Sequence, residues 1–241
     1  MLSMTAPAGS LVKTTLVDFP GRVASAFFLS GCNLRCPYCY NKQLVENSSS
    51  ENYVSIQQLF DHLEKRKNII SGLVISGGEA LLSPYLETII RTAKSKGYSI
   101  KLDTNGTFPE KLAGLIQNPE TKPDYIAMDI KTSLEKYKML TASNETFSQI
   151  ADKLKKSISI ISSYPQTDRE FRTVLVPPLT SKDDIQKIAS LLPEDASWYF
   201  AQFQNNSCLS PEYEKIQPYN DAETAAIVKF AQSFIPNAKL R

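Results

Sequence analysis

The chain has little of what marks membrane, secreted or nucleic-acid-binding proteins. No run in its 241 residues approaches the roughly 18 apolar residues that a membrane span needs. The N-terminal segment lacks a charged start followed by an apolar core, so we expect no secretory signal. A net charge of +2 without a basic block gives no indication of nucleic-acid binding. These absences predict a cytoplasmic protein, in which thiols stay reduced.

Cysteine is scarce as well, and its distribution is uneven. Three of the four cysteines, Cys32, Cys36 and Cys39, lie within the stretch GCNLRCPYCYN. A disulfide would use only two of them, and clustered cytosolic cysteines are more often metal ligands or catalytic groups. Pro37 and the neighbouring glycine and asparagine favour a loop over a helix. Thiolates in such a loop suit zinc or an iron–sulfur cluster.

A structural zinc ion needs four protein ligands, and the sequence offers few candidates for the fourth. The single histidine, His62, lies in a polar helical stretch and is expected at the surface. Cys208 is distant in sequence and is expected not to be a ligand. Three thiolates on a four-iron cluster would leave one iron open to a small molecule. A zinc-stabilised binding module without catalysis remains the alternative from a different class.

Apolar runs and apolar helical stripes alternate along the chain. Strands are expected at residues 23–31, 72–78, 98–106, 124–131, 170–177 and 197–203. Helices are expected around residues 56–63, 86–93, 150–161, 185–192 and 221–234, the fourth capped by Thr180 or Ser181. This alternation predicts an α/β fold with a parallel sheet and helical crossovers. Because no linker or low-complexity tract interrupts it, residues 1–241 are expected to form a single domain.

Polar and glycine-rich segments follow the predicted strands. The cysteine loop follows the first strand, and the segments SGGE, DTNG, MDIK and QFQNN end four of the others. Arg172 lies within the fifth strand. Barrel-like and open β/α folds both place their chemistry at the carboxyl ends of the strands. We therefore expect the functional site there.

The cysteine spacing, with an aromatic residue before the last cysteine, resembles the radical S-adenosylmethionine (SAM) superfamily. Together with KTTLVDFPGRVASAFFLSGC before it and GGEALL, DTNGT and MDIK after it, it resembles the activating enzymes of glycyl radical enzymes. The likeness covers roughly residues 12–205 and is greatest to the activators of anaerobic ribonucleoside-triphosphate reductase. It implies a radical SAM domain folded as a partial (β/α)6 TIM-type barrel. In this family the three cysteines bind three irons of a [4Fe–4S] cluster, and SAM binds the fourth.

The resemblance also implies roles for residues outside the cysteine loop. Gly77, Gly78 and Glu79 would receive the amino group of SAM, and Lys131 would neutralise its carboxylate. Asp103 and Asp129 resemble acids that bind SAM or a nearby monovalent cation. The remaining candidates are Tyr38 beside the adenine, Arg172 as a ligand contact or an ion pair, and Gln204, where some activators carry a histidine near the ribose. Ala80 departs from the proline that many relatives have.

The chemistry implied is reductive cleavage of SAM to methionine and a 5′-deoxyadenosyl radical. The radical would take a hydrogen atom from a glycine of a partner glycyl radical enzyme, with anaerobic ribonucleotide reductase as the expected partner. A flavodoxin- or ferredoxin-type protein would supply the electron. A radical SAM enzyme that acts on a small molecule, of the deazapurine-synthase type, is the alternative within the superfamily, although those enzymes often space the first two cysteines differently.

Overall fold

The computed structural model describes residues 3–46, 52–141 and 146–241. The chain groups into two compact units. Unit 1 is made of Met1–Asn33, Gln43–Thr104 and Glu110–Ile126, and unit 2 of Leu34–Lys42, Asn105–Pro109 and Ala127–Arg241. That residues 1–241 form a single domain stays a prediction. None of the described helices is long and apolar enough to cross a membrane.

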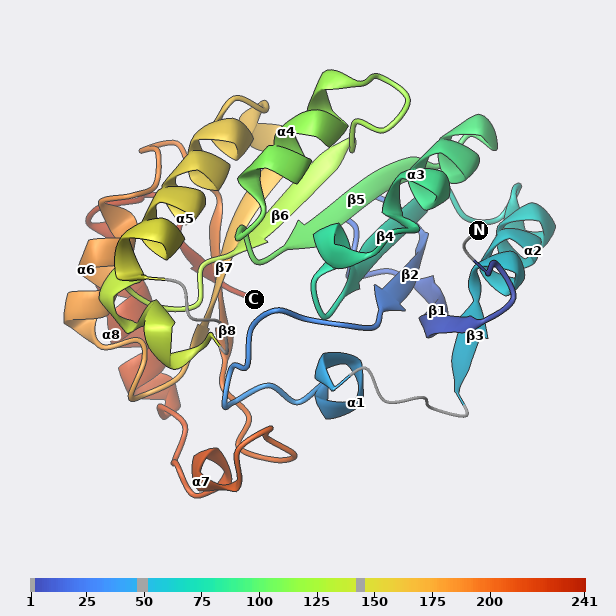
Figure 1. The fold of residues 1–241 in the computed structure, drawn as a ribbon. Coiled ribbons are helices and arrows are strands. Elements are labelled where there is room, and N and C mark those ends of the chain that lie inside the picture. The colour runs from blue at the N-terminus through green and yellow to red at the C-terminus, as the bar shows by residue number, and fades with distance from the viewer. Residues whose placement is uncertain (1–2, 47–51, 142–145) are drawn as a thin grey trace. The chain divides into compact units, whose positions relative to one another are not determined.

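Unit 1 is a mixed sheet with helices. Its strands are β1 (Pro7–Thr15), β2 (Ala24–Leu29), β3 (Tyr53–Ser55), β4 (Gly72–Gly77) and β5 (Ser99–Thr104), in the spatial order β3-β1-β2-β4-β5. Strand β2 is parallel to β4, and β4 to β5, whereas β1 is antiparallel to both of its neighbours. The helical elements are α1 (Lys42–Val45, whose first residue belongs to unit 2), α2 (Ile56–Arg66), η1 (Ala80–Leu82), α3 (Leu86–Ser95) and α4 (Pro109–Gln117, which starts in unit 2). Helix α3 lies in front of β4 and β5 in Figure 1.

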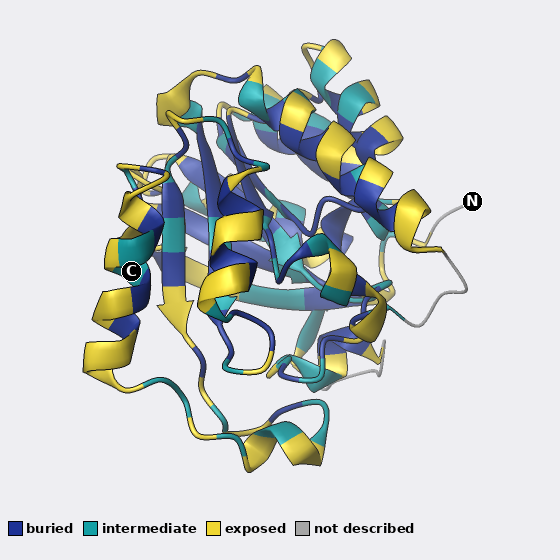
Figure 2. Ribbon diagram, turned by 90° about the vertical axis from the view of Figure 1, so that its left-hand side faces the viewer, coloured by how far each residue is buried: buried dark blue, intermediate teal, exposed yellow. Residues whose placement is uncertain are grey.

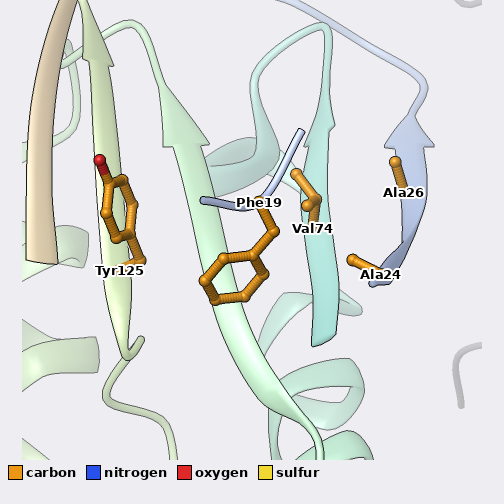
Figure 3. Close-up of a cluster of buried hydrophobic side chains, with 5 residues drawn as sticks. All are labelled: Phe19, Ala24, Ala26, Val74 and Tyr125. Carbon is orange, nitrogen blue, oxygen red and sulfur yellow. The ribbon is translucent and has the colours of Figure 1, made fainter. Parts of the chain in front are cut away.

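The inner core of unit 1 holds small side chains beneath one aromatic ring. Phe19 comes from the segment between β1 and β2 and packs on Ala24, Ala26 and Val74 (Figure 3). Its ring centroid lies 6.0 Å from that of Tyr125. A Cβ atom on Gly72 would approach this Phe19 ring to 2.8 Å, so glycine is needed at that position. The connection from β1 to β2 is therefore fixed by a buried side chain.

Unit 2 carries the second set of strands and helices. Strands β7 (Arg169–Leu175), β8 (Trp198–Gln202) and β9 (Lys239–Leu240) are parallel. The helical elements are η2 (Leu134–Met139), α5 (Phe147–Ser162), η3 (Gln166–Asp168), α6 (Lys182–Ala189), α7 (Pro211–Glu214) and α8 (Asp221–Gln232). Strand β6 (Tyr125–Asp129) begins in unit 1 and ends in unit 2, where the Ile130 N–H donates to the Arg172 carbonyl at 2.8 Å.

Local sequence explains where these elements begin. The Ser181 hydroxyl accepts from the Asp184 N–H and the Asp184 carboxylate accepts from the Ser181 N–H, a capping box that starts α6. Ser55 and Gln58 form the same motif at α2. The helices are buried on one face and exposed on the other, as Figure 2 shows. In α3 the buried face consists of the predicted stripe, Leu86, Ile89, Ile90 and Ala93.

All six predicted strands and all five predicted helices are present, so the predicted α/β class is confirmed. Among the described elements that were not predicted, β1 and α4 are the longest. Strand β1 was missed because its residues are buried and exposed without regular alternation. Helix α4 was missed because only Leu112 and Leu115 form its buried stripe.

Candidate functional site

The cysteine segment is a loop, as Pro37 predicted. Cys36 is buried, Cys32 and Cys39 are partly exposed, and none of the three forms a disulfide. The Cys39 N–H donates to the Cys36 carbonyl at 3.0 Å. The second half of the loop is held from the far end of the sequence, because the Leu209 N–H donates to the Cys39 carbonyl and the Ser210 N–H to the Pro37 carbonyl, both at 2.8 Å. These bonds fix the backbone that presents Cys36 and Cys39.

The glycines after β4 hold the start of the same loop. The Glu79 N–H donates to the Gly31 carbonyl at 2.8 Å. A Cβ atom on Gly78 would lie 2.1 Å from that carbonyl oxygen and 3.0 Å from the Cβ of Cys32. Gly77 has φ +123°, in the range that favours glycine. The glycines thus have a packing role beside Cys32, which the sequence analysis did not anticipate.

Cys32 belongs to unit 1, and Cys36 and Cys39 belong to unit 2, so each unit by itself carries part of the motif. Among the described residues, no three histidine, cysteine, aspartate or glutamate side chains form a group that could hold a metal ion. Cys208 is fully buried, and its thiol lies 3.8 Å from the Gln204 carbonyl. Burial, followed by the charge of Glu214, raises the pKa of the Cys208 thiol and disfavours the thiolate that a metal needs.

Three of the predicted SAM contacts come together in unit 2 around one carboxylate. Asp129 accepts from Arg172 Nε at 2.7 Å through one oxygen and from Lys131 Nζ at 3.3 Å through the other. The Lys131 N–H donates to the Tyr137 hydroxyl oxygen at 2.9 Å. Asp129 is the last residue of β6, Lys131 lies two residues beyond it, and Arg172 lies on β7. Of the two roles expected for Arg172, a ligand contact or an ion pair, the structure contains an ion pair with Asp129.

The pKa values of these groups follow from their pairing. Burial alone would raise the pKa of Asp129, but Arg172 and Lys131 outweigh it and hold that pKa well below its usual value. Burial alone would lower the pKa of Lys131, but the Asp129 charge outweighs it and raises that pKa well above its usual value. Both groups are therefore charged at neutral pH. Nζ of Lys131 has three donors, and the described residues give it one acceptor.

Two residues that were not predicted, Glu170 and Arg241, extend the row of charges formed by Lys131, Asp129 and Arg172. Glu170 is fully buried and accepts from Arg241 at 3.0 and 2.7 Å. Its carboxylate also lies 3.9 Å from Arg172 Nη1. Glu170 and Arg172 are two positions apart on one strand and so share a face. That spacing is a signal from which the pairing could have been inferred.

Tyr38, between the second and third cysteines, is buried, and no described residue hydrogen-bonds its hydroxyl. Its ring meets that of Phe203 edge-on, with centroids 6.4 Å apart. Burial, followed by the nearby Cys36, raises the pKa of Tyr38, so the hydroxyl stays protonated. An unsatisfied buried hydroxyl costs about 1–3 kcal/mol.

The remaining predicted residues have other contacts within their own units. In unit 1, Asp103 pairs with Lys101 at 2.8 Å, and Glu79 accepts from the Thr104 hydroxyl at 2.8 Å. Gln204 in unit 2 is exposed after β8. His62, expected at the surface, is partly buried instead, because its Nε2 lies 2.9 Å from the hydroxyl of the fully buried Ser25.

Comparison with known proteins identifies the family. A protein of Methanocaldococcus jannaschii named for glycyl-radical enzyme activation is 31% identical over 240 residues, or 99% of this chain and 97% of that protein. The pyruvate formate-lyase-activating enzyme of Clostridium pasteurianum is 29% identical over 190 residues, 76% of this chain and 74% of that enzyme. A structure of TYW1 with a lysine-pyruvate adduct bound shares the fold, with a TM-score of 0.60 at 14% identity over 88% of this chain and 74% of that one. The sequence also matches the model of the radical SAM superfamily over residues 27–192. The chain therefore belongs to the radical SAM superfamily, as its cysteine motif predicted.

Proposed function

We propose that this radical SAM enzyme activates a glycyl radical enzyme by removing a hydrogen atom from one of its glycines. The observation that carries the proposal is the likeness, over 99% of the chain, to a protein named for glycyl-radical enzyme activation. A backbone glycyl radical is stabilised by the flanking amides, and a glycine-containing loop can enter a narrow site. We propose anaerobic ribonucleotide reductase as the partner and a flavodoxin- or ferredoxin-type protein as the electron donor, both in the cytoplasm.

The donor set of the chain fits a [4Fe–4S] cluster with one open iron. Cys32, Cys36 and Cys39 carry thiols that are not in a disulfide, and the fourth cysteine, Cys208, is a buried thiol with a raised pKa. When bound, the cluster supplies the electron that cleaves SAM. The three cysteines would hold it, and the hydrogen bonds from Leu209 and Ser210 keep the second half of the loop in place.

Lys131 is the residue we propose for the SAM carboxylate. Its ammonium is charged, and its side chain is 19% exposed. Among the described residues its ammonium makes one hydrogen bond, which leaves two donors for a bound carboxylate. Asp129 is held by two cations, so its role is to orient Lys131. The buried hydroxyl of Tyr38 is a further donor that a ligand would satisfy.

The proposal is tested by anaerobic incubation of the iron-loaded protein with SAM, a reductant and candidate partners. A glycyl radical doublet in the electron paramagnetic resonance spectrum of a partner is the expected result. Cys36→Ala should abolish both iron binding and 5′-deoxyadenosine formation, and it serves as the control. Wild-type protein that forms 5′-deoxyadenosine without a protein radical would favour the small-molecule alternative. Colourless protein with one zinc ion would refute the radical chemistry.

A further inference from the structure

The two carboxylates assigned by resemblance to a monovalent cation are each neutralised within their own unit. In unit 1, Lys101 Nζ donates to Asp103 at 2.8 Å, and the two side chains are only 1% and 12% exposed. The ammonium also lies 5.8 Å from the centre of the Tyr125 ring. A lysine this deeply buried is rare unless it is paired, and here its carboxylate partner lies two residues away on the same strand.

In unit 2 the second carboxylate is paired still more completely. One oxygen of Asp129 accepts from Arg172 and the other from Lys131. Arg172 also faces Glu170, which Arg241 holds in turn. Both oxygens that a cation would use are therefore already bound to positive side chains.

The binding free energy of an alkali cation at either Asp103 or Asp129 would be small. The cation would need several oxygen ligands, from carboxylates or carbonyls, to replace its water. The ammonium or guanidinium already present supplies the compensating charge, and it would repel a second cation placed beside it. The residues therefore do not fit the cation that the resemblance implies.

We propose that this chain uses its own side chains in place of a monovalent cation. Lys101 neutralises the charge of Asp103, and Arg172 and Lys131 neutralise that of Asp129. The inference rests on the proposed function because it concerns the groups assigned to SAM. It predicts that SAM binding and protein stability do not depend on K⁺ or Na⁺ beyond the general effect of ionic strength.

The first test uses the wild-type protein. Iron-loaded protein is prepared free of alkali cations, and its SAM affinity and melting temperature are measured in KCl, NaCl or choline chloride at equal ionic strength. Equal values in the three salts are expected. A saturable gain in affinity or melting temperature with K⁺ or Na⁺ would overturn the inference, because a bound ion stabilises by mass action.

The second test removes the internal cation. In Lys101→Met, Asp103 loses the positive charge of the Lys101 ammonium, so K⁺ should now raise the melting temperature and the SAM affinity in a saturable way. Lys101→Arg keeps the charge and should behave like the wild type. A Lys101→Met protein indifferent to K⁺ would contradict the role of Lys101. If this variant does not fold, the measurements on the wild-type protein in the three salts decide whether an alkali cation binds.

The outcomes separate this inference from the proposed function. Wild-type protein that binds SAM only with K⁺ refutes the inference and leaves the proposed function standing. Protein that binds no SAM in any salt refutes the proposed function, and the melting temperatures of the ligand-free protein still decide whether a cation binds.

Discussion

Replacing Glu170 by glutamine would leave Arg172 and Arg241 facing a neutral amide at a fully buried position. Removing one partner of a buried ion pair costs roughly 3–5 kcal/mol, because the remaining charge is left uncompensated. The Arg241 side chain is 43% exposed, so water can solvate part of its charge. We therefore expect a loss of about 2–3 kcal/mol in the free energy of unfolding. In a chain of this size that corresponds to about 4–12 °C in melting temperature.

The measurement is thermal and urea denaturation of Glu170→Gln beside a matched control. Glu212→Gln makes the same chemical change in a pair with Lys215 whose side chains are 77% and 73% exposed. Such a surface pair contributes little, and the control should stay within about 0.5 kcal/mol of the wild type. Equal stability of the two variants would refute the reasoning that the row of charges stabilises this part of the protein. An unchanged urea m value would assign the loss to the native state.

Three further predictions concern individual side chains. Lys131→Met should keep its iron, but its SAM dissociation constant, measured by calorimetry, should rise about tenfold or more, since a charge-assisted hydrogen bond contributes about 1.5–3 kcal/mol. An unchanged dissociation constant would show that Lys131 does not anchor the SAM carboxylate. Tyr38→Phe should raise the melting temperature of the ligand-free protein, because it removes an unsatisfied hydroxyl, and should weaken SAM binding; a lower melting temperature would mean that the hydroxyl already has a partner. Burial, followed by the Arg66 charge, lowers the pKa of His62 below its usual 6.5, so protonation favours the unfolded chain and wild-type stability should fall as the pH drops below about 6.5. Urea midpoints should show this fall in the wild type and not in His62→Gln; parallel curves would contradict the assignment.

The elements of the fold could largely be predicted because apolar periodicity is a local signal. The capping box at Ser181 and the stripe of α3 are visible in short stretches of sequence. Strand β1 gave no such signal, since its burial depends on the strands beside it. The loop at the cysteines was predictable because Pro37 excludes a regular helix whatever surrounds it.

The pairing of charges could not be predicted in the same way. Asp129 and Arg172 are 43 residues apart, and only the packing of β6 beside β7 brings them together. Lys101 is a single lysine in an apolar run, and by itself it gives no signal of a functional role. Its position two residues before Asp103 does place both residues on one face of a strand. The free hydroxyl of Tyr38 depends on everything that surrounds it and has no local signal.

The two hydrogen bonds from Leu209 and Ser210 to the cysteine loop bear on when the loop can take its final conformation during synthesis. Leu209 and Ser210, which hold the Cys39 and Pro37 carbonyls, lie some 170 positions downstream and leave the ribosome long after the loop does. Domains form as their sequence emerges, N-terminal parts first. Until residues 209 and 210 have been synthesised, the backbone at Pro37 and Cys39 lacks these two hydrogen bonds. Delivery of iron and sulfide is thus expected only after Leu209 and Ser210 have been made and have bound the loop.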